Sequence, residues 1–313
     1  MKPAPLTFTP LFMERVWGGR GLQEAFGKPL PDGAPIGESW EVVDRPEAQS
    51  VVASGPLAGV ELHQLWREDR ERIFGARAAG AGDRFPILVK LLDARETLSV
   101  QVHPPAHLAE ELGGEPKNEL WYVAGAAPAA NLFAGLRKGV SQEDFSTALE
   151  AGEDVSEMLH RIEVQVGDAL FIPAGRVHAI GAGCLVVEIQ QSSDTTYRVF
   201  DFDRPGLDGK PRELHVPQSL ASIDFSDLEP ALRPPGDGIV LANENFTVSH
   251  RNVEGAAERV TADGECALVG VLTGEATCGE EHFGPGSFFL VPADTGSRLP
   301  VSGPAEVLLT ELP

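Results

Sequence analysis

The sequence predicts a mainly β protein made of two β units, with a small helical insert in the first. The chain has 313 residues, of which 42% are hydrophobic, so it is long enough to bury a large core and to form two domains. Its 34 glycines and 25 prolines exceed ordinary usage without any period, as expected for many short strands joined by turns. The pattern GDALFIPAG, from Gly167, returns as GSFFLVPAD, from Gly286, which indicates a duplicated β unit.

The first part of the chain contains few clear elements before a helix and a buried strand. Residues 5–60 mix short apolar runs with turns, and only 39–43 and 50–52 are predicted as strands. Segment 60–78 places apolar residues at helical spacing, with charges on the other face, and predicts one helix. Segment 85–94, FPILVKLLDA, is a near-continuous apolar run, which is typical of a strand buried on both faces.

A helical insert is expected at about 139–160. Ser141 is a good N-cap residue, acidic residues occupy the first turn, and an apolar stripe follows. Segment 228–238 contains a double proline and two glycines, and it is the best candidate for a linker. We therefore expect an N-terminal domain, 1–230, and a C-terminal domain, 231–313.

Charge and cysteine usage exclude several function classes. The net charge of −22 argues against binding to nucleic acid or to anionic membranes, and an anionic substrate would need a locally basic pocket. No apolar run is long enough for a signal peptide or a membrane span, so we expect a soluble, cytoplasmic protein. Cys184, Cys266 and Cys278 are widely spaced and form no CxxC pair, so they are expected to be core thiols. The sequence leaves the oligomeric state open.

Polar residues alternate with apolar ones in two nearby segments, SVQVHP and KNELWYV. Because strand side chains alternate between faces, Gln101 and His103 share one face, and so do Lys117 and Glu119. Polar groups in an apolar enclosure are costly unless they are paired or bind an ion. With His178, which follows IPAG, the set offers two imidazoles, a carboxylate and an amide oxygen, and it predicts a metal site. The other six histidines are expected to be ordinary residues: His63, His107, His160, His215, His250 and His282.

These motifs resemble those of a known superfamily. His103, Glu119 and Gly125, followed by G-x5-P-A-G-x2-H from Gly167 to His178, resemble the two cupin motifs, with Gln101-Val-His103 in place of the usual first HxH. Together with EIQQSSDTTYRVFDFDR, the motifs SVQVHP, KNELWYV and IPAGRVHAI are similar to type I phosphomannose isomerase in its short bacterial form. The resemblance runs from PLFMERVWGG to about residue 215, and the second cupin repeat is poor in motifs.

The resemblance implies a fold and a set of site residues. The fold would be two cupin-like β-barrel or jelly-roll domains, with one zinc ion in the first and no metal in the second. Pro116 departs from the pattern, because longer members of the family have histidine before the lysine. The implied zinc ligands are Gln101, His103, Glu119 and His178; the implied catalytic residues are Lys117 and Arg198; the implied residues at the phosphate end are Lys90 and Ser99.

The resemblance also implies a reaction on a small sugar phosphate. Mannose 6-phosphate and fructose 6-phosphate would interconvert through a cis-enediol, which requires an acid–base group and a group that stabilises an enediolate. Zinc suits nitrogen and oxygen ligands and can polarise sugar oxygens. We expect the cation to lower the pKa of Lys117, which would then act in proton transfer, and Arg198 to act as an electrostatic stabiliser.

Each cation has an ordinary structural alternative. Lys117 could be a surface lysine paired with Glu115, and Lys90 could be a side chain that extends to solvent from a strand end. Arg198 could form a structural ion pair with Asp201 or Asp203.

Two other functions stay open from the sequence. Two histidines and a carboxylate also suit an Fe(II) cupin oxygenase. A non-enzymatic sugar-binding cupin is the third alternative, although a pure binding protein has no need for the four ligand residues.

Overall fold

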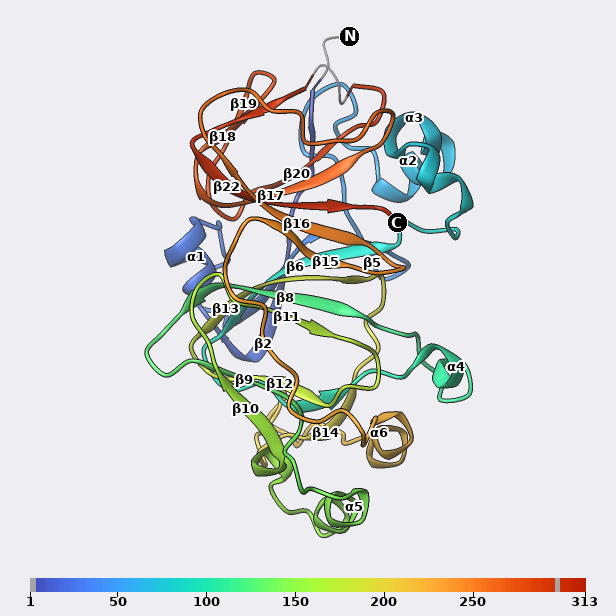
Figure 1. Ribbon diagram of the computed structural model, residues 1–313, viewed down its shortest axis with the longest axis vertical. Coiled ribbons are helices and arrows are strands. Elements are labelled where there is room, and N and C mark those ends of the chain that lie inside the picture. The colour runs from blue at the N-terminus through green and yellow to red at the C-terminus, as the bar shows by residue number, and fades with distance from the viewer. Residues whose placement is uncertain (1–3, 296–298) are drawn as a thin grey trace.

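The β-sheets of the protein lie in successive layers along its long axis (Figure 1). The computed structural model describes residues 4–295 and 299–313. Two six-stranded sheets pack face to face in the middle, a five-stranded sheet packs on one of them, and a three-stranded sheet packs on the other. A two-stranded ribbon is formed by β4 (Asp44–Arg45) and β5 (Ala48–Gln49). The architecture is mainly β, as the sequence predicts.

The first pair of sheets contains most of the N-terminal part of the chain. Its six-stranded sheet has the order β11-β8-β13-β6-β3-β2, and its five-stranded sheet has the order β10-β9-β12-β7-β14. The strands of the six-stranded sheet are β2 (Leu11–Gly19), β3 (Ile36–Val42), β6 (Ile87–Ala94), β8 (Glu119–Ala126), β11 (Ala169–Ile172) and β13 (Cys184–Gln191). Those of the five-stranded sheet are β7 (Val100–Val102), β9 (Asn131–Leu136), β10 (Leu159–Glu163), β12 (His178–Ile180) and β14 (Tyr197–Phe200).

The second pair of sheets contains the C-terminal part of the chain and one strand from the N-terminus. The first strand, β1, pairs with β20, so the two ends of the chain share a sheet. The six-stranded sheet contains β1 (Leu6–Thr7), β15 (Gly238–Ala242), β16 (Thr247–Val253), β17 (Ala267–Gly274), β20 (Phe288–Val291) and β22 (Ala305–Glu311). The three-stranded sheet contains β18 (Ala276–Cys278), β19 (Glu281–Phe283) and β21 (Val301–Ser302).

The helices are short and lie on the outside of the stacked sheets (Figure 1). Among the described residues, no helix is long and apolar enough to cross a membrane. The α-helices are α1 (Gly21–Phe26), α2 (Leu62–Glu68), α3 (Arg70–Phe74), α4 (Ala106–Ala109), α5 (Gln142–Glu150) and α6 (Val216–Ser222), and the 3-10 helices are η1 (Ala76–Gly80) and η2 (Val155–Met158).

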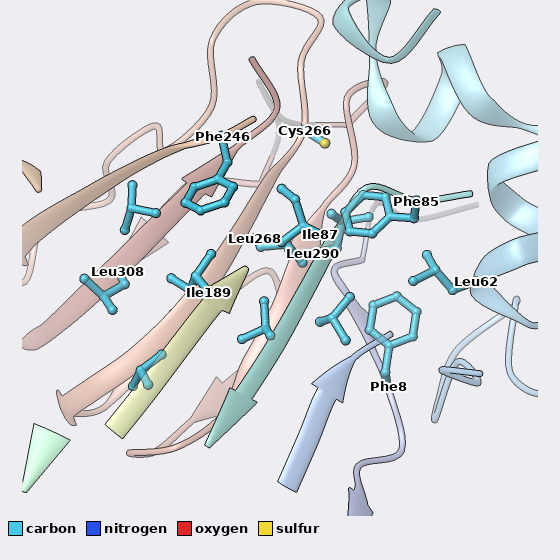
Figure 2. Close-up of a cluster of buried hydrophobic side chains, with 14 of the residues drawn as sticks. Phe8, Leu62, Phe85, Ile87, Ile189, Phe246, Cys266, Leu268, Leu290 and Leu308 are labelled. Atoms are coloured by element: carbon cyan, nitrogen blue, oxygen red, sulfur yellow. The ribbon is translucent and has the colours of Figure 1, made fainter. Parts of the chain in front are cut away.

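The apolar run at 85–94 forms the buried strand that it predicts. Every residue of β6 is buried, because the strand lies in the middle sheet between two other layers. Figure 2 shows one side of this packing, where Ile87 and Ile189 face Leu268 and Leu290 of the C-terminal sheet. All three cysteines are buried free thiols, as expected.

The prediction for residues 5–60 was wrong about the longest strand. The nine-residue strand β2 was not expected, because it is an edge strand whose pairing with β3 shifts register twice, so its residues show no simple alternation. Of the two strands that were predicted there, the first corresponds to β3. The second, 50–52, forms only isolated bridges at Val51 and Val52.

The single helix predicted for 60–78 is in fact three short helices, α2, α3 and η1. Asp69 and Gly75 separate them. Gly75 has a φ of 90°, which residues with a side chain rarely adopt, and it forms a bridge with Glu265 of the C-terminal part. The apolar periodicity is therefore real, but tertiary contacts interrupt the helix.

The helical insert is present and its N-terminus is as predicted. Ser141 caps α5 through a capping box with Asp144, and η2 follows. The insert ends at Met158, where β10 begins at once. The domain boundary at 228–238 stays a prediction.

The sequence repeat folds alike in its two copies. Gly167 donates its N–H to the carbonyl of Val123 (2.9 Å), and Gly286 donates to the carbonyl of Val271 (2.8 Å). Both glycines have a positive φ, 94° and 77°, and both are followed by a strand, β11 and β20. The prediction of a duplicated β unit is confirmed at this turn.

Candidate functional site

One face of the five-stranded sheet presents a row of three polar side chains. His178 of β12 lies directly opposite Gln101 of β7, and Gln101 lies opposite Arg198 of β14. Residues that pair directly across antiparallel strands point to the same face, with Cβ atoms about 4.5–5.5 Å apart. The register therefore places an imidazole, an amide and a guanidinium side by side.

The six-stranded sheet that faces this row presents a second set of polar residues. Lys90 of β6 pairs in register with Glu188 of β13, and Glu188 pairs with Trp121 of β8. Glu119 lies two residues before Trp121 and so shares its face, and Lys117 precedes it by two more. All five side chains are buried.

Three acceptor atoms converge where the two sets of residues meet. They come from Glu119, from His178 and from His103, which directly follows β7. Glu119 Oε1 lies 2.8 Å from His103 Nε2 and 3.4 Å from His178 Nε2, and all three side chains are fully buried. One potential ligand atom from each residue lies within 4.8 Å of the others, and no second group of this kind occurs in the described part of the chain. Each of the six remaining histidines lies outside this group.

The hydrogen bonds of the two imidazoles show that this cluster fits a cation. His103 Nδ1 lies 2.8 Å from the Thr195 carbonyl and His178 Nδ1 lies 2.8 Å from the Arg176 carbonyl, so each Nδ1 must carry a proton to donate. A neutral ring then has a bare lone pair at Nε2, which points at the carboxylate of Glu119. Glu119 Oε2 lies 3.2 Å from Lys117 Nζ, whereas His178 Nε2 has no hydrogen-bond partner. Acceptors that face one another without a donor need a cation between them, and backbone carbonyls often orient metal-binding histidines in this way.

The protonation states agree with this interpretation. Burial lowers the pKa of His103 well below its ordinary value, and the charge of Lys117 adds to the effect. Burial and the neighbouring His103 lower the pKa of His178 to about 3. Burial alone would raise the pKa of Glu119, but Lys117 and His178 outweigh it and the pKa falls. All three groups are therefore in the deprotonated, ligating state at neutral pH.

A cavity of about 560 Å³ lies beside the cluster. Its size suits a small organic substrate. The structure brings the remaining predicted site residues together in its wall: Lys90, Ser99, Gln101, Lys117 and Arg198.

The surface alternatives for the two lysines are wrong. Lys117 is 3% exposed, and its Nζ lies 3.2 Å from Glu119 Oε2 and 3.8 Å from Glu188 Oε1 rather than beside Glu115. Lys90 is in the middle of β6 and lies 3.3 Å from Glu188. Burial lowers the pKa of Lys117, but the two carboxylates more than offset this, so its pKa is raised. With these two carboxylates beside it Lys117 is a charged ammonium, and the expectation that a bound cation lowers its pKa stays a prediction.

Arg198 does not form the structural ion pair that was the alternative to an active-site role. Its Nη1 donates to the carbonyl of Glu213 (2.7 Å), and its buried Nε has no partner. Within the described residues Asp201 instead binds Arg212 and Arg204. The guanidinium of Arg198 therefore faces the cavity without a paired carboxylate.

The sequence prediction did not include several residues of the cavity. Glu188 contacts both lysines, and Glu38 receives two hydrogen bonds from Arg15, both 3.0 Å. Glu188 lies in the apolar run LVVEIQ, as Lys90 lies in FPILVKLLDA. The same signal, a charged residue inside an apolar run, was therefore present for both. Arg15 and Glu38 lie in or beside the strand β2 that was missed. The cavity residues absent from the prediction include Arg15, Glu38, Glu188, Asp194 and Arg212.

Known proteins are similar to this chain in sequence and in fold. The catalytic-domain model of type I phosphomannose isomerase matches residues 6–131. The mannose-6-phosphate isomerase ManA of Bacillus subtilis is 37% identical over 309 residues, which cover 97% of this chain and 89% of the relative. The mannose-6-phosphate isomerase of Streptococcus mutans is 37% identical, with 88% of this chain and 89% of the relative covered.

A solved structure agrees with these relatives. The crystal structure of the mannose 6-phosphate isomerase from Bacillus subtilis has a TM-score of 0.84 and 30% identity, and the match covers 99% of this chain and 100% of the other. Identity at this level over nearly the whole length, together with the shared fold, shows that the protein belongs to the type I phosphomannose isomerase family.

Proposed function

We propose that this protein is a zinc-dependent mannose-6-phosphate isomerase, which interconverts mannose 6-phosphate and fructose 6-phosphate. The observation that carries the proposal is the buried set of facing acceptors at His103, Glu119 and His178 beside a cavity of sugar size. The names of the relatives supply the substrate.

The ligand set of the proposal is Gln101, His103, Glu119 and His178, with one zinc ion per chain. Gln101 is included because the register places its side chain beside His178 on the same face. When bound, zinc would polarise the sugar oxygens and stabilise negative charge on them. Nitrogen and oxygen ligands suit this ion.

The reaction moves one proton from C2 to C1 and another from the C2 hydroxyl to the C1 oxygen, so it needs no external oxidant or reductant. In the proposal Lys117 donates a proton to the C1 oxygen and takes one back from the C2 hydroxyl, so it ends the reaction in its starting protonation state. Arg198 stabilises the negative charge of the enediolate, because its Nε has no other partner and the group remains charged. Lys90 and Ser99 contact the substrate from the cavity wall.

A coupled assay of the purified protein with mannose 6-phosphate tests this function. Activity should be present in the zinc-loaded protein, fall to background after chelation, and return when zinc is added back. Bound iron together with oxygen uptake would instead favour the oxygenase. A metal-bound protein that binds the sugar phosphate without turnover would favour the non-enzymatic binding protein.

A further inference from the structure

Arg198 is anchored at the outer edge of β14 by a residue to which the function above gives no role. β14 is the last strand of the five-stranded sheet, so no further strand of the described chain pairs along its outer edge. Residues 213–215 lie at this edge instead, and α6 begins directly after them and lies beside β14 (Figure 1). This short segment is therefore in position to act on Arg198.

His215 makes two hydrogen bonds with the backbone of Arg198. Its N–H donates to the Arg198 carbonyl (2.8 Å), and its Nδ1 accepts from the Arg198 N–H (3.1 Å). A backbone N–H can only donate, so Nδ1 must be unprotonated and the proton of the neutral ring is on Nε2. This is the opposite tautomer to that of His103 and His178, whose Nδ1 atoms donate. The ring of His215 is thus fixed as the acceptor for one particular N–H group.

These two hydrogen bonds determine which way the backbone of Arg198 faces. Both of its backbone groups point to His215 and away from β7. Gln101, which lies opposite Arg198 in the register, therefore forms the non-hydrogen-bonded type of antiparallel pair with it, in which the side chains are closer together. The contact with His215 on the outside of the sheet thus brings Arg198 and Gln101 together at the cavity, which both residues line.

The side chain of Arg198 is held by the same segment. Its Nη1 donates to the Glu213 carbonyl (2.7 Å), while its buried Nε has no hydrogen-bond partner. A carbonyl orients a guanidinium without neutralising its charge, so the charge stays available to a developing anion. The backbone and the guanidinium of Arg198 therefore both depend on where residues 213–215 lie.

His215 is itself fixed at several points. Its carbonyl accepts from the Ser219 N–H (2.8 Å) in the first turn of α6, and its ring lies against Tyr197 with the ring centroids 6.0 Å apart. Apolar residues of α6 pack against the hydrophobic cluster that contains Tyr197. The side chain of His215 is only partly exposed. A histidine held in this way can keep its neighbour on β14 in one position.

We propose that His215 is a positioning residue for Arg198, whose backbone it holds so that the guanidinium faces the reacting oxygens. The catalytic role of Arg198 rests on the proposed function. His215 is not among the residues that line the cavity, so it acts through Arg198 and not on the substrate. The effect can be large, because a displacement of about 1 Å in a catalytic group can cost about 100-fold in rate.

The test compares H215N with H215Q in the metal-replete full chain. The amide oxygen of asparagine is bonded to Cγ, as Nδ1 is, so it can accept from the Arg198 N–H, whereas the oxygen of glutamine lies one carbon further from the backbone. We expect H215N to keep the kcat for mannose 6-phosphate within about threefold of the wild type, and H215Q to lose about 10-fold to 100-fold in kcat with less than about a threefold change in KM. H160Q changes a partly exposed histidine on β10, at the opposite edge of the same sheet, and should resemble the wild type.

A double-mutant cycle determines whether the effect passes through Arg198. In the Arg198→Ala background H215Q should lower kcat by less than about threefold, because the group that it would displace is already absent. A loss of the same size in both backgrounds would overturn the proposal. Equal kcat values for H215N and H215Q, or a raised KM at constant kcat in H215Q, would overturn it as well.

A structural measurement makes the test independent of catalysis. The NMR signal of the Arg198 Nε–H group, assigned by its loss in Arg198→Ala, should shift or broaden in H215Q and stay unchanged in H215N and H160Q. An unchanged signal in H215Q would contradict the positioning role. If H215Q does not fold, H215L, which also lacks the acceptor, is measured in the same way. A wild-type protein that does not isomerise mannose 6-phosphate, but whose Arg198 signal changes in H215Q and not in H215N, would contradict the proposed function while supporting the positioning role.

Discussion

At the residue scale, the chemistry of this protein depends on which nitrogen of each histidine carries a proton. Backbone carbonyls at Thr195 and Arg176 accept from the Nδ1 atoms of His103 and His178. That assignment leaves both Nε2 atoms as acceptors that face Glu119. A local backbone contact therefore prepares two side chains from different strands to bind the same cation.

Replacement of one ligand tests this arrangement directly. His178→Ala should weaken metal binding by at least about 100-fold, since even the loss of an indirect partner of a ligand costs up to that factor. The circular dichroism spectrum should stay native, because the hydrophobic core clusters do not include this side chain. Metal content measured by mass spectrometry checks the result. His107→Ala, at an exposed position, is the control and should keep its metal. Full metal occupancy in His178→Ala would refute the site.

Arg198 allows a kinetic test of its proposed role. If it stabilises the enediolate, Arg198→Ala should lower kcat by about 100-fold, the cost of removing one preorganised donor, and change KM much less. Steady-state kinetics with metal content confirmed would measure both constants. Wild-type kcat in Arg198→Ala would assign this residue to another role.

At the element scale, contacts with distant parts of the chain decide where helices and strands end. Segment 60–78 has helical periodicity, yet Gly75 divides it, since the chain there lies against Gly264 and Glu265 of the C-terminal part. A Cβ on Gly75 would meet the carbonyl oxygen of Gly264 at 2.5 Å and Cα of Glu265 at 2.9 Å. At this break in the helix, the chain therefore contacts the second pair of sheets.

We expect Gly75→Ala to destabilise the protein by about 2 kcal/mol or more, because a positive φ and a backbone clash act together. Urea unfolding followed by fluorescence gives the change in the free energy of unfolding. Gly80→Ala is the matched control: a Cβ there meets nothing within 4 Å, and the free energy should change by less than about 0.5 kcal/mol. Equal stability of the two variants would show that the turn at Gly75 tolerates a side chain.

At the scale of the whole molecule, the stacked sheets restrict where charged side chains can find partners, and the net charge determines the long-range interaction with the substrate. Each middle sheet is buried on both faces, so the charged residues of β6 and β13 must find partners inside the protein. Lys90 and Glu188 do so across the register of these two strands. The remaining acidic excess gives a charge of −22. A dianionic substrate is therefore repelled at long range and attracted only within the cavity.

The salt dependence of KM follows from the difference between long-range repulsion and short-range attraction within the cavity. Inert salt that shortens the Debye length from about 30 Å to about 10 Å screens the distant repulsion more than contacts inside the cavity. The KM for mannose 6-phosphate should therefore stay constant or fall as NaCl is added over this range, while an enzyme that steers its substrate by a basic surface would show a rise. Steady-state kinetics across an NaCl series provides the measurement, and a several-fold increase in KM would contradict this account.

The sequence by itself determined the mainly β architecture, the duplicated turn, the helical insert and the residues of the candidate metal site. These features depend on local patterns: polar residues alternate with apolar ones around Gln101 and His103, and a repeated glycine marks the same turn twice. It also marked Lys90 as unusual, because a charge inside an apolar strand needs a partner. It could not name that partner.

Only the tertiary structure decided how these pieces combine. The partners of Lys90 and Lys117, the freedom of Arg198 and the position of Arg212 all depend on strands and loops distant in sequence. Strand register and sheet packing determine such contacts. A single sequence carries no local signal for the register of an irregular edge strand such as β2. The cluster of His103, Glu119 and His178 could therefore be predicted from the sequence, but the electrostatic balance of the cavity could not.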